Sequence, residues 1–179
     1  CASFGTADGD PPAMFYFSSL GETMIQLLRV DHRLLHGQVA VSWVQGLHSD
    51  CVFCVGDKIA NDPVWKTTLK LGKPAGCKLV IKDMAHAIEA INSGVTDKYR
   101  MLISVQTIAE AKQLVEGCPQ IKSINLGNTK ASPTTKEVAR QVFLEPEEFD
   151  MLRELVDKGV EVEVRPLADD PKIDARTFL

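Results

Sequence analysis

From Met24 onward, short apolar runs alternate with segments of helical periodicity, and this alternation limits the folds that the chain can adopt. Each run is apolar at most positions, which is typical of strands covered on both faces of a sheet. The expected strands are Ile25–Val30, Cys51–Val55, Cys77–Ile81, Tyr99–Ser104 and Ile121–Leu126.

Helix-like segments connect these runs, and several begin with a residue that can cap a helix. Asp62 precedes Pro63, Asp83 precedes a second segment and Thr107 precedes a third. The expected helices are Gln38–Gly46, Asn61–Leu71, Met84–Asn92 and Ile108–Glu116. The rhythm predicts an α/β fold: a mostly parallel, doubly wound sheet with right-handed crossovers and helices on both faces.

The C-terminal part continues this pattern more loosely. Gln141–Leu144 is a brief strand candidate, and Pro146–Lys158 is an acidic helix that ends at Gly159. Val160–Arg165 alternates valine with glutamate, the pattern of a half-exposed or edge strand. We therefore expect an antiparallel edge near the C-terminus and one domain over residues 24–179.

Composition and charge exclude several classes of function. The chain has 179 residues, of which 45% are hydrophobic and 25% charged, as in ordinary soluble globular proteins. A net charge of −4 argues against a broad nucleic-acid surface. No apolar run approaches the roughly 20 residues of a membrane-spanning helix. Residues 1–23 lack the basic start of a secretory signal, so we expect a flexible leader or a remnant of cloning, with Met24 as the natural start.

The cysteines indicate buried thiols in a reducing compartment. They are scattered over positions 1, 51, 54, 77 and 118, and three lie in strand-like runs. Cys51 and Cys54 form a C-x-x-C pair, but in a strand these two positions point to opposite faces of the sheet. We therefore expect no disulfide framework and no redox or zinc site.

The loop after the first strand carries the chemistry. It reads Arg33-Leu34-Leu35-His36-Gly37-Gln38-Val39 and precedes a helix. Ligands of open α/β sheets bind outside the carboxyl ends of the strands, where this loop lies. A histidine is mostly neutral and nucleophilic near neutral pH, and an arginine beside a helix N-terminus stabilises a phosphoryl group. The stretch indicates phosphoryl transfer on His36.

Polar residues after the fourth and fifth strands lie on the same expected rim. Their side chains could donate hydrogen bonds to a phosphate or a partner protein, and ordinary turn and capping chemistry is the alternative. They are Ser104, Gln106, Thr107, Asn128, Thr129 and Lys130.

The stretch Val30-Asp31-His32-Arg33-Leu34-Leu35-His36-Gly37-Gln38-Val39 resembles the IIB component of the mannose/fructose/sorbose family of the bacterial phosphoenolpyruvate-dependent sugar phosphotransferase system (PTS). The similarity continues to near the C-terminus. It includes residues 40–43, Asp57–Asp62, Asn125–Asn128 and Gly159–Arg165.

The resemblance implies the roles of the loop residues. His36 would accept phosphate, Arg33 would steady it, and Asp31 would orient Arg33 or His36. From their positions at the helix start and on the rim, and not from the resemblance, further phosphate contacts are expected from Gly37, Gln38, Ser104 and Thr107. Gly37 has no Cβ, so its backbone can approach the phosphate closely.

The resemblance also implies the reaction and the partners. The chain would be a protein-Nπ-phosphohistidine–sugar phosphotransferase that needs no cofactor and no metal. A IIA protein or domain would donate the phosphoryl group, and a sugar presented by the membrane components IIC and IID would accept it. The protein would be cytoplasmic and peripherally associated with the transporter, with no nucleic-acid partner.

Three alternatives stay open. The sheet edge could bind a nucleotide or another small ligand, although no G-x-G-x-x-G or Walker-type loop is present. His32 and His36, four residues apart, could hold a metal in a hydrolase if the segment were helical. The chain could also be a regulatory homologue that transfers no phosphate.

Overall fold

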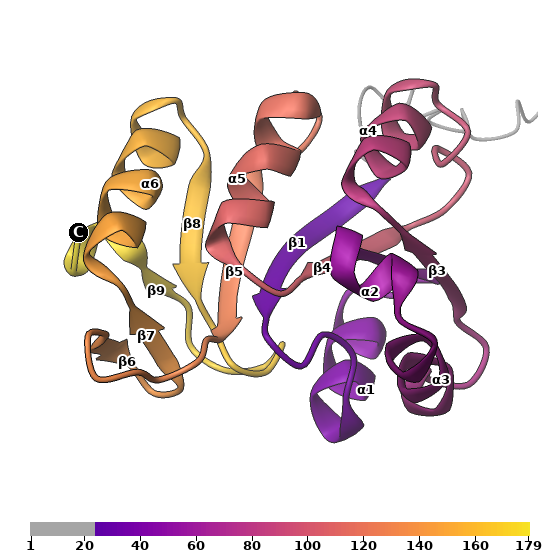
Figure 1. Cartoon of the computed structure of the whole chain (residues 1–179), viewed down its shortest axis with the longest axis horizontal. Coiled ribbons are helices and arrows are strands. Elements are labelled where there is room, and N and C mark those ends of the chain that lie inside the picture. Colours follow the sequence, from indigo (N-terminus) through magenta and orange to yellow (C-terminus); the bar gives the residue numbers. More distant parts are fainter. Residues whose placement is uncertain (1–23) are drawn as a thin grey trace, which may run out of the picture.

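The computed structural model describes residues 24–179, so the leader expected at residues 1–23 lies outside the described residues. The helices and strands follow one another as the alternation predicts (Figure 1). They are β1 Ile25–Asp31, α1 Gly37–Gly46, β2 Cys51–Val55, α2 Asp57–Asn61, α3 Pro63–Gly72, β3 Lys78–Lys82, α4 Met84–Asn92, β4 Met101–Val105, α5 Ile108–Gly117, β5 Ser123–Asn128, β6 Lys136–Ala139, β7 Val142–Leu144, α6 Pro146–Asp157, β8 Glu161–Val164, β9 Ile173–Asp174 and the 3-10 turn η1 Ala175–Thr177.

The central sheet has the strand order β3-β2-β4-β1-β5-β8-β9. All neighbouring pairs are parallel except β8 and β9, which are antiparallel. Both the doubly wound parallel sheet and the antiparallel edge near the C-terminus are confirmed. β6 and β7 form a separate antiparallel hairpin.

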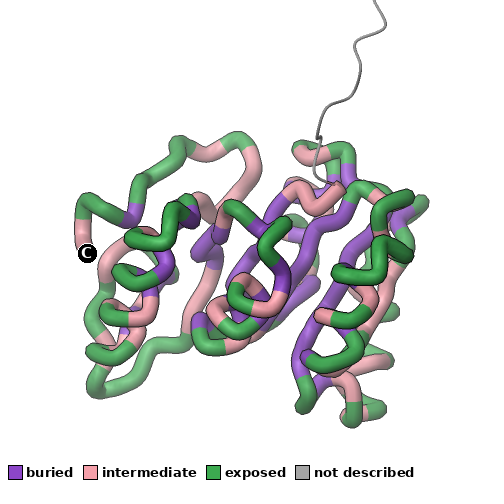
Figure 2. The backbone as a smooth tube through the Cα atoms, turned by 90° about the horizontal axis from the view of Figure 1, so that it is seen from above, coloured by how far each residue is buried: buried purple, intermediate pink, exposed green. Residues whose placement is uncertain are grey.

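Helices cover both faces of the sheet, and each face has its own hydrophobic core. Buried side chains of α4, α5 and α6 pack in one core, and those of α1, α2 and α3 pack in the other. Seen from above, the strands are mainly buried while the outer turns of the helices are exposed (Figure 2). β1 and its neighbour β4 lead into helices on opposite faces, so a crevice opens beyond their carboxyl ends.

The predicted helix caps are present. The side chain of Asp62 accepts hydrogen bonds from the backbone N–H groups of Val64 and Trp65, and Asp83 accepts one from that of His86. Thr107 and Glu110 form a reciprocal capping box at the start of α5. Each satisfies amide donors that a helix start leaves free.

Two features of local structure differ from the predictions. The helix expected over Asn61–Leu71 is α3, which begins at Pro63 behind the Asp62 cap, and the sequence pattern does not indicate the short helix α2 before it. Asp62, which precedes Pro63, is extended between the two helices. The segment Val160–Arg165 is not an edge strand, since β8 lies between β5 and β9. Glu161 is exposed, but Glu163 on the same face is only 2% exposed, so one of the two glutamates in the alternation is a buried charge instead of a solvated one.

The cysteines of the described part are free and buried. Cys51 packs in the core under α4–α6 and Cys54 in the core under α1–α3, on opposite faces as expected. Burial raises the pKa of Cys54 to about 12 and that of Cys51 to about 11. Both side chains therefore remain thiols at neutral pH and act as small apolar groups.

Candidate active site

The loop Asp31–His36 is held in one shape by its own backbone and by two leucines. The carbonyl of Asp31 accepts a hydrogen bond from Leu34 N–H at 2.8 Å, and its carboxylate accepts one from Arg33 N–H at 3.0 Å. Leu34 and Leu35 are buried in the core under α1–α3. Leu34 has φ of +61°, a left-handed conformation that costs a branched residue about 1–2 kcal/mol. Burial of the two leucines fixes the strained turn that presents His36.

His36 is the N-cap residue of α1, and its side chain does not cap the helix. The first helical backbone bond runs from Ala40 N–H to the carbonyl of His36. The N–H groups of Gly37, Gln38 and Val39 therefore have no acceptor within the described part of the chain. Such free donors at a helix start form an anion site. Gly37 begins the helix with φ of +46°, a conformation that favours glycine.

Asp31 lies behind the imidazole and is fully buried, with 0% of its side chain exposed. Its Oδ1 lies 4.0 Å from Nδ1 of His36, and that nitrogen is buried without a hydrogen-bond partner of its own. Burial lowers the pKa of His36 below its ordinary value, and the positive charges of Arg33 and Arg29 lower it further, while Asp31 opposes them. His36 is therefore neutral near pH 7, the form in which a ring nitrogen has a free lone pair.

Beneath the loop, Asp31 belongs to a buried charged network. Arg29 donates from Nη2 to Oδ2 of Asp31 at 3.2 Å and from Nη1 to Oδ1 of Asn125 at 2.6 Å. Asn125 donates to Oε1 of Glu163 at 3.2 Å, and Arg165 donates to the same oxygen at 2.9 Å. The network ties β1, β5 and β8 together under the loop.

An aromatic ring and a glycine complete the packing of this network. The guanidinium carbons of Arg29 and Arg165 lie 5.3 and 4.9 Å from the ring centroid of Trp43. Gly127 leaves the space that Arg29 fills, because a Cβ there would lie 2.0 Å from Cζ of Arg29. Arg29 can therefore occupy this position only because residue 127 is a glycine.

Sequence reasoning missed this network. Arg29, Asn125 and Glu163 lie in runs whose pattern predicts only strands, yet a charged or amide side chain inside a strand covered on both faces needs a partner. That rule could have indicated a buried network. The sequence does not show which residues pair, because three separated strands supply them.

The predicted site residues are only partly brought together. Arg33 is exposed and its charge acts on His36, and its guanidinium makes no ion pair with Asp31, whose buried partner is Arg29. Gln38 is exposed on the first turn of α1. Ser104 is buried in β4 opposite Arg29, and its hydroxyl has no partner among the described residues. The hydroxyl of Thr107 accepts a hydrogen bond from the backbone N–H of Glu110 in the capping box of α5. For Ser104 and Thr107, a phosphate contact stays a prediction.

Several rim residues line a cavity of about 460 Å³ beside the loop. The side-chain amide of Gln106 donates to the carbonyl of His32 at 3.1 Å and connects this cavity with the loop. The residues that line it come from the loop, from the starts of α2, α5 and α6, and from the segment between β5 and the end of the β6–β7 hairpin. They include His32, Lys58, Gln106, Thr107, Thr129 and Lys130.

The arrangement combines a nucleophile with groups that stabilise a transferred phosphoryl group. His36 is neutral and partly exposed, the free N–H groups of the first turn of α1 follow it, and the positive charge of the exposed Arg33 acts on its ring. Phosphoryl transfer depends mainly on positioning and on stabilisation of charge spread over the phosphate oxygens. The loop and the first turn of α1 supply both.

Comparison with known proteins decides the family. The family model for the "PTS system sorbose subfamily IIB component" matches residues 25–179, which is nearly the whole described chain. The chain belongs to this family.

Individual proteins of the PTS are also similar to this chain in sequence. A probable phosphotransferase enzyme IIB component of Streptococcus pyogenes is 32% identical over 138 residues, which cover 74% of this chain and 85% of the relative. The mannose-specific EIIAB component of Escherichia coli is 31% identical over 150 residues, which cover 84% of this chain. That match is 46% of the relative, so the chain spans about half the length of the EIIAB proteins.

The fold of a solved IIB structure agrees as well. The IIBSor domain of the sorbose permease from Klebsiella pneumoniae superimposes with a TM-score of 0.79 at 27% identity. The match covers 84% of this chain and 92% of the domain. Within residues 24–179, no helix has the length and apolar character needed to cross a bilayer.

Proposed function

We propose that this IIB chain carries a phosphoryl group on His36, received from a IIA protein or domain and passed to a sugar. The observation that supports the proposal most is the position of His36, a neutral imidazole at an uncapped helix start with Arg33 beside it. The free N–H groups of the helix and the guanidinium offer donors to the phosphate oxygens.

The transfer has two steps. In the first, a ring nitrogen of His36 attacks the phosphorus of the donor phosphohistidine, whose N–P bond breaks as a new N–P bond forms. In the second, a sugar hydroxyl attacks that phosphorus, the bond to His36 breaks, and the proton lost by the hydroxyl balances the one that the leaving imidazole gains, so His36 returns to its neutral form. The donor is already activated, so neither step requires a nucleotide or a metal.

Within this scheme Asp31 acts behind the histidine. Its carboxylate faces the ring and fixes the backbone of Arg33, so it orients both partners without touching the phosphate. We assign Gly37 and Gln38 to the phosphate through their backbone N–H groups. Ser104 and Thr107 are candidates for side-chain contacts.

The family supports the proposed partners. Relatives are named as mannose-, sorbose- and N-acetylgalactosamine-specific components, so the acceptor is a sugar of this class. We propose that membrane components IIC and IID present the sugar. The chain would work in the cytoplasm, peripherally associated with that transporter.

Intact-mass spectrometry tests the proposal. The chain is incubated with phosphoenolpyruvate, the general PTS proteins and a matched IIA, whose own phosphorylation is recorded in the same sample. We expect one phosphate adduct, labile in acid and stable in base, on the parent chain and none on the His36→Ala variant. The matched control is His86→Ala, because His86 is 64% exposed, paired with Asp83 and remote in sequence from the loop.

The controls separate the possible failures. A full adduct on His36→Ala would refute His36 as the acceptor, and loss of that adduct in His32→Ala would place it on the neighbouring histidine instead. No adduct on the parent chain with two phosphorylated IIA proteins would favour a homologue that transfers no phosphate. Nucleotide binding in calorimetry would then support the ligand-binding alternative.

A further inference from the structure

The open edge of the sheet at β3 is strongly basic although the chain as a whole is acidic. Residues 63–82 contain no aspartate or glutamate, while the net charge of the chain is −4. The lysines of this segment lie on α3, directly after it and on β3, and one more follows α4. Together they define the basic edge: Lys66, Lys70, Lys73, Lys78, Lys82 and Lys98.

These lysines have no acidic partners. None of the six forms an ion pair with any residue in the 24–179 range. Lys73 donates to the carbonyl of Cys77, and Lys78 donates to the hydroxyl of Tyr99. On α3, Lys66 and Lys70 are four residues apart, where like charges destabilise a helix. The uncompensated charge is therefore a cost to the isolated protein.

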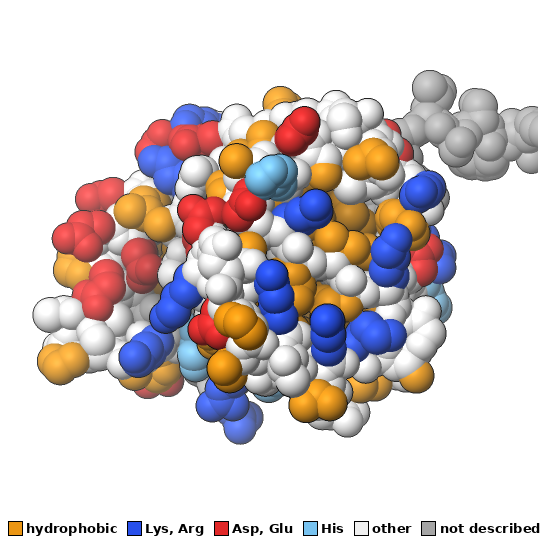
Figure 3. Space-filling model, turned by 45° about the vertical axis from the view of Figure 1, so that its right-hand side comes forward, with side chains coloured by type: hydrophobic (Ala, Val, Ile, Leu, Met, Phe, Trp, Pro, Cys, Tyr) orange, Lys and Arg blue, Asp and Glu red, His pale blue; other side chains and the backbone are white. Residues whose placement is uncertain are grey.

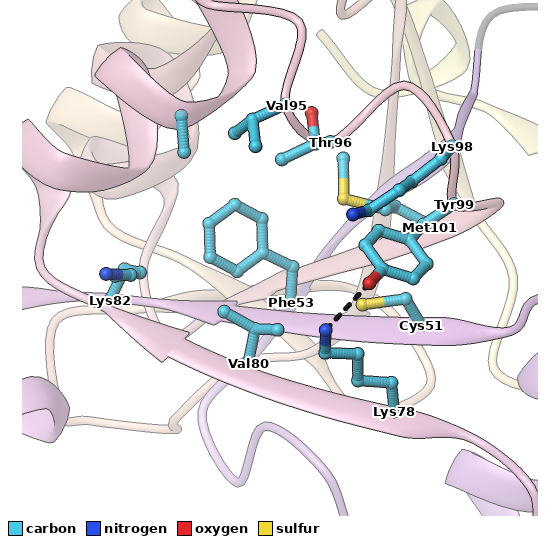
Figure 4. Close-up of a pocket in the computed structure, with 11 residues that line it drawn as sticks. Cys51, Phe53, Lys78, Val80, Lys82, Val95, Thr96, Lys98, Tyr99 and Met101 are labelled. Atoms are coloured by element: carbon cyan, nitrogen blue, oxygen red, sulfur yellow. Dashed lines mark hydrogen bonds between the residues drawn. The ribbon is translucent and has the colours of Figure 1, made fainter.

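Apolar side chains lie between the lysines. Val64 and Leu71, seven residues apart on one face of α3, are 73% and 84% exposed. On the other side of β3, Phe53, Val80, Val95 and Met101 line a hollow of about 250 Å³ (Figure 4). Lys78, Lys82 and Lys98 also line this hollow. The space-filling view of this side of the molecule shows lysine and arginine side chains with hydrophobic ones among them (Figure 3).

We propose that the basic edge docks on the surface of an anionic phospholipid bilayer. Exposed aliphatic groups flanked by lysines are the combination that binds the headgroup region of such membranes. The biological use of this contact rests on the proposed function, because a carrier held at the membrane meets its acceptor at a raised effective concentration.

The position of α3 fits this role. A Cβ added at Gly72 would lie 3.0 Å from the carbonyl oxygen of Leu35, the residue before His36. The last turn of α3 therefore packs against the loop Asp31–His36. Docking through α3 brings His36 close to the membrane surface.

Two other roles for the basic edge are protection of the sheet edge and binding of an acidic protein. Each explains fewer of its residues than membrane docking does. Lysines on an edge strand prevent strand pairing between molecules, and Lys78 and Lys82 serve that purpose, but this does not explain Val64, Leu71 or the lysines of α3. An acidic protein partner would favour arginine, which forms forked ion pairs and is enriched at interfaces where lysine is depleted. Every cation in residues 63–82 is a lysine.

Vesicle flotation with the full chain tests the proposal. We expect binding to phosphatidylcholine vesicles that contain about a third phosphatidylglycerol, none to pure phosphatidylcholine, and release at high salt. The variant Lys66→Gln/Lys70→Gln/Lys82→Gln should bind on the order of 100-fold more weakly, from about fivefold for each lysine near the surface. These three side chains make no hydrogen bond or ion pair within residues 24–179, so the variant is expected to fold; circular dichroism checks this.

A matched control removes the same charge elsewhere. Lys122→Gln/Lys136→Gln/Arg140→Gln changes three exposed cations near β5 and the β6–β7 hairpin, on the other side of β1. It should bind like the parent chain. A second variant, Val64→Ser/Leu71→Ser, should weaken binding without changing its salt dependence.

Three results would overturn the proposal. In the first, the parent chain does not bind anionic vesicles. In the second, the control triple variant loses as much vesicle binding as the basic-edge triple variant. In the third, vesicles are not bound, while the chain binds IIA in a salt-dependent way and only the basic-edge variant loses that binding. The last would assign the surface to an acidic protein. Phosphorylation of His36 by IIA is measured on the same variants. Its loss or retention tests the proposed function separately from lipid binding.

Discussion

Replacing Arg29 by methionine would test the buried network most directly. The change keeps an apolar stem beside Trp43 but removes the cation that faces Asp31. The Asp31 carboxylate would then be buried with only the N–H of Arg33 and the ring of His36 near it. Breaking a buried ion pair in this way costs about 3–5 kcal/mol. The Oδ1 of Asn125 also loses its donor, which adds about 1 kcal/mol.

Urea unfolding measures this loss. With a slope near 2 kcal/mol per M for a domain of this size, the midpoint should fall by about 2–3 M. The double variant Arg29→Met/Asp31→Leu removes both charges and should regain at least about 2 kcal/mol relative to the additive expectation. Phosphate acceptance should stay low in both variants, because the support of the loop is lost.

Two outcomes would refute this account of Arg29. One is a midpoint shift below about 0.5 M in the single variant, which would show that the ion pair contributes little. The other is a double variant whose loss equals the sum of the single changes. Normal phosphate acceptance in Arg29→Met would separately exclude a role of the network in positioning the loop.

Further predictions concern single positions. Because the pKa of His36 lies below its ordinary value, the folded chain binds this proton more weakly than the unfolded chain, so the free energy of unfolding should fall as the pH drops below about 6.5. In an NMR titration Arg33→Gln should raise the pKa of His36, and an unchanged value would place the guanidinium elsewhere. Gln141 has φ of +66° in the hairpin turn, so Gln141→Gly should stabilise the chain by up to about 1 kcal/mol in thermal unfolding, whereas a loss would show that its side chain contributes. Gly127→Ala should displace Arg29 and lower the urea midpoint about as much as Arg29→Met, and a tolerated alanine would contradict the close packing.

Local sequence signals predict most of the fold. Cys51–Val55 and Met84–Asn92 have the predicted bounds, since a short apolar run and a capped amphipathic segment are recognisable without tertiary information. Asp62 is recognisable as the cap of α3, but the five-residue helix α2 before it is too short to show a helical period. The error at Val160–Arg165 has another cause: alternating valine and glutamate looks the same whether a carboxylate faces water or is buried against an arginine, as Glu163 is against Arg165.

The candidate site, like the fold, has a part that the sequence predicts and a part that it does not. His36, Arg33 and Asp31 are neighbours along the chain, so the sequence alone brings them into one loop at the carboxyl end of a strand. The turn between them is local as well, because Asp31 bonds to the backbone two and three residues ahead.

Only the tertiary structure decided what lies beneath that loop. Arg29, Asn125 and Glu163 come from three strands, and their pairing depends on the register of β1, β5 and β8 in the folded sheet. The same holds for the basic edge, where α3 and β3 join lysines that the sequence spaces at irregular intervals. A linear pattern records which side chains are present, but burial and charge pairing arise only when separated segments pack together.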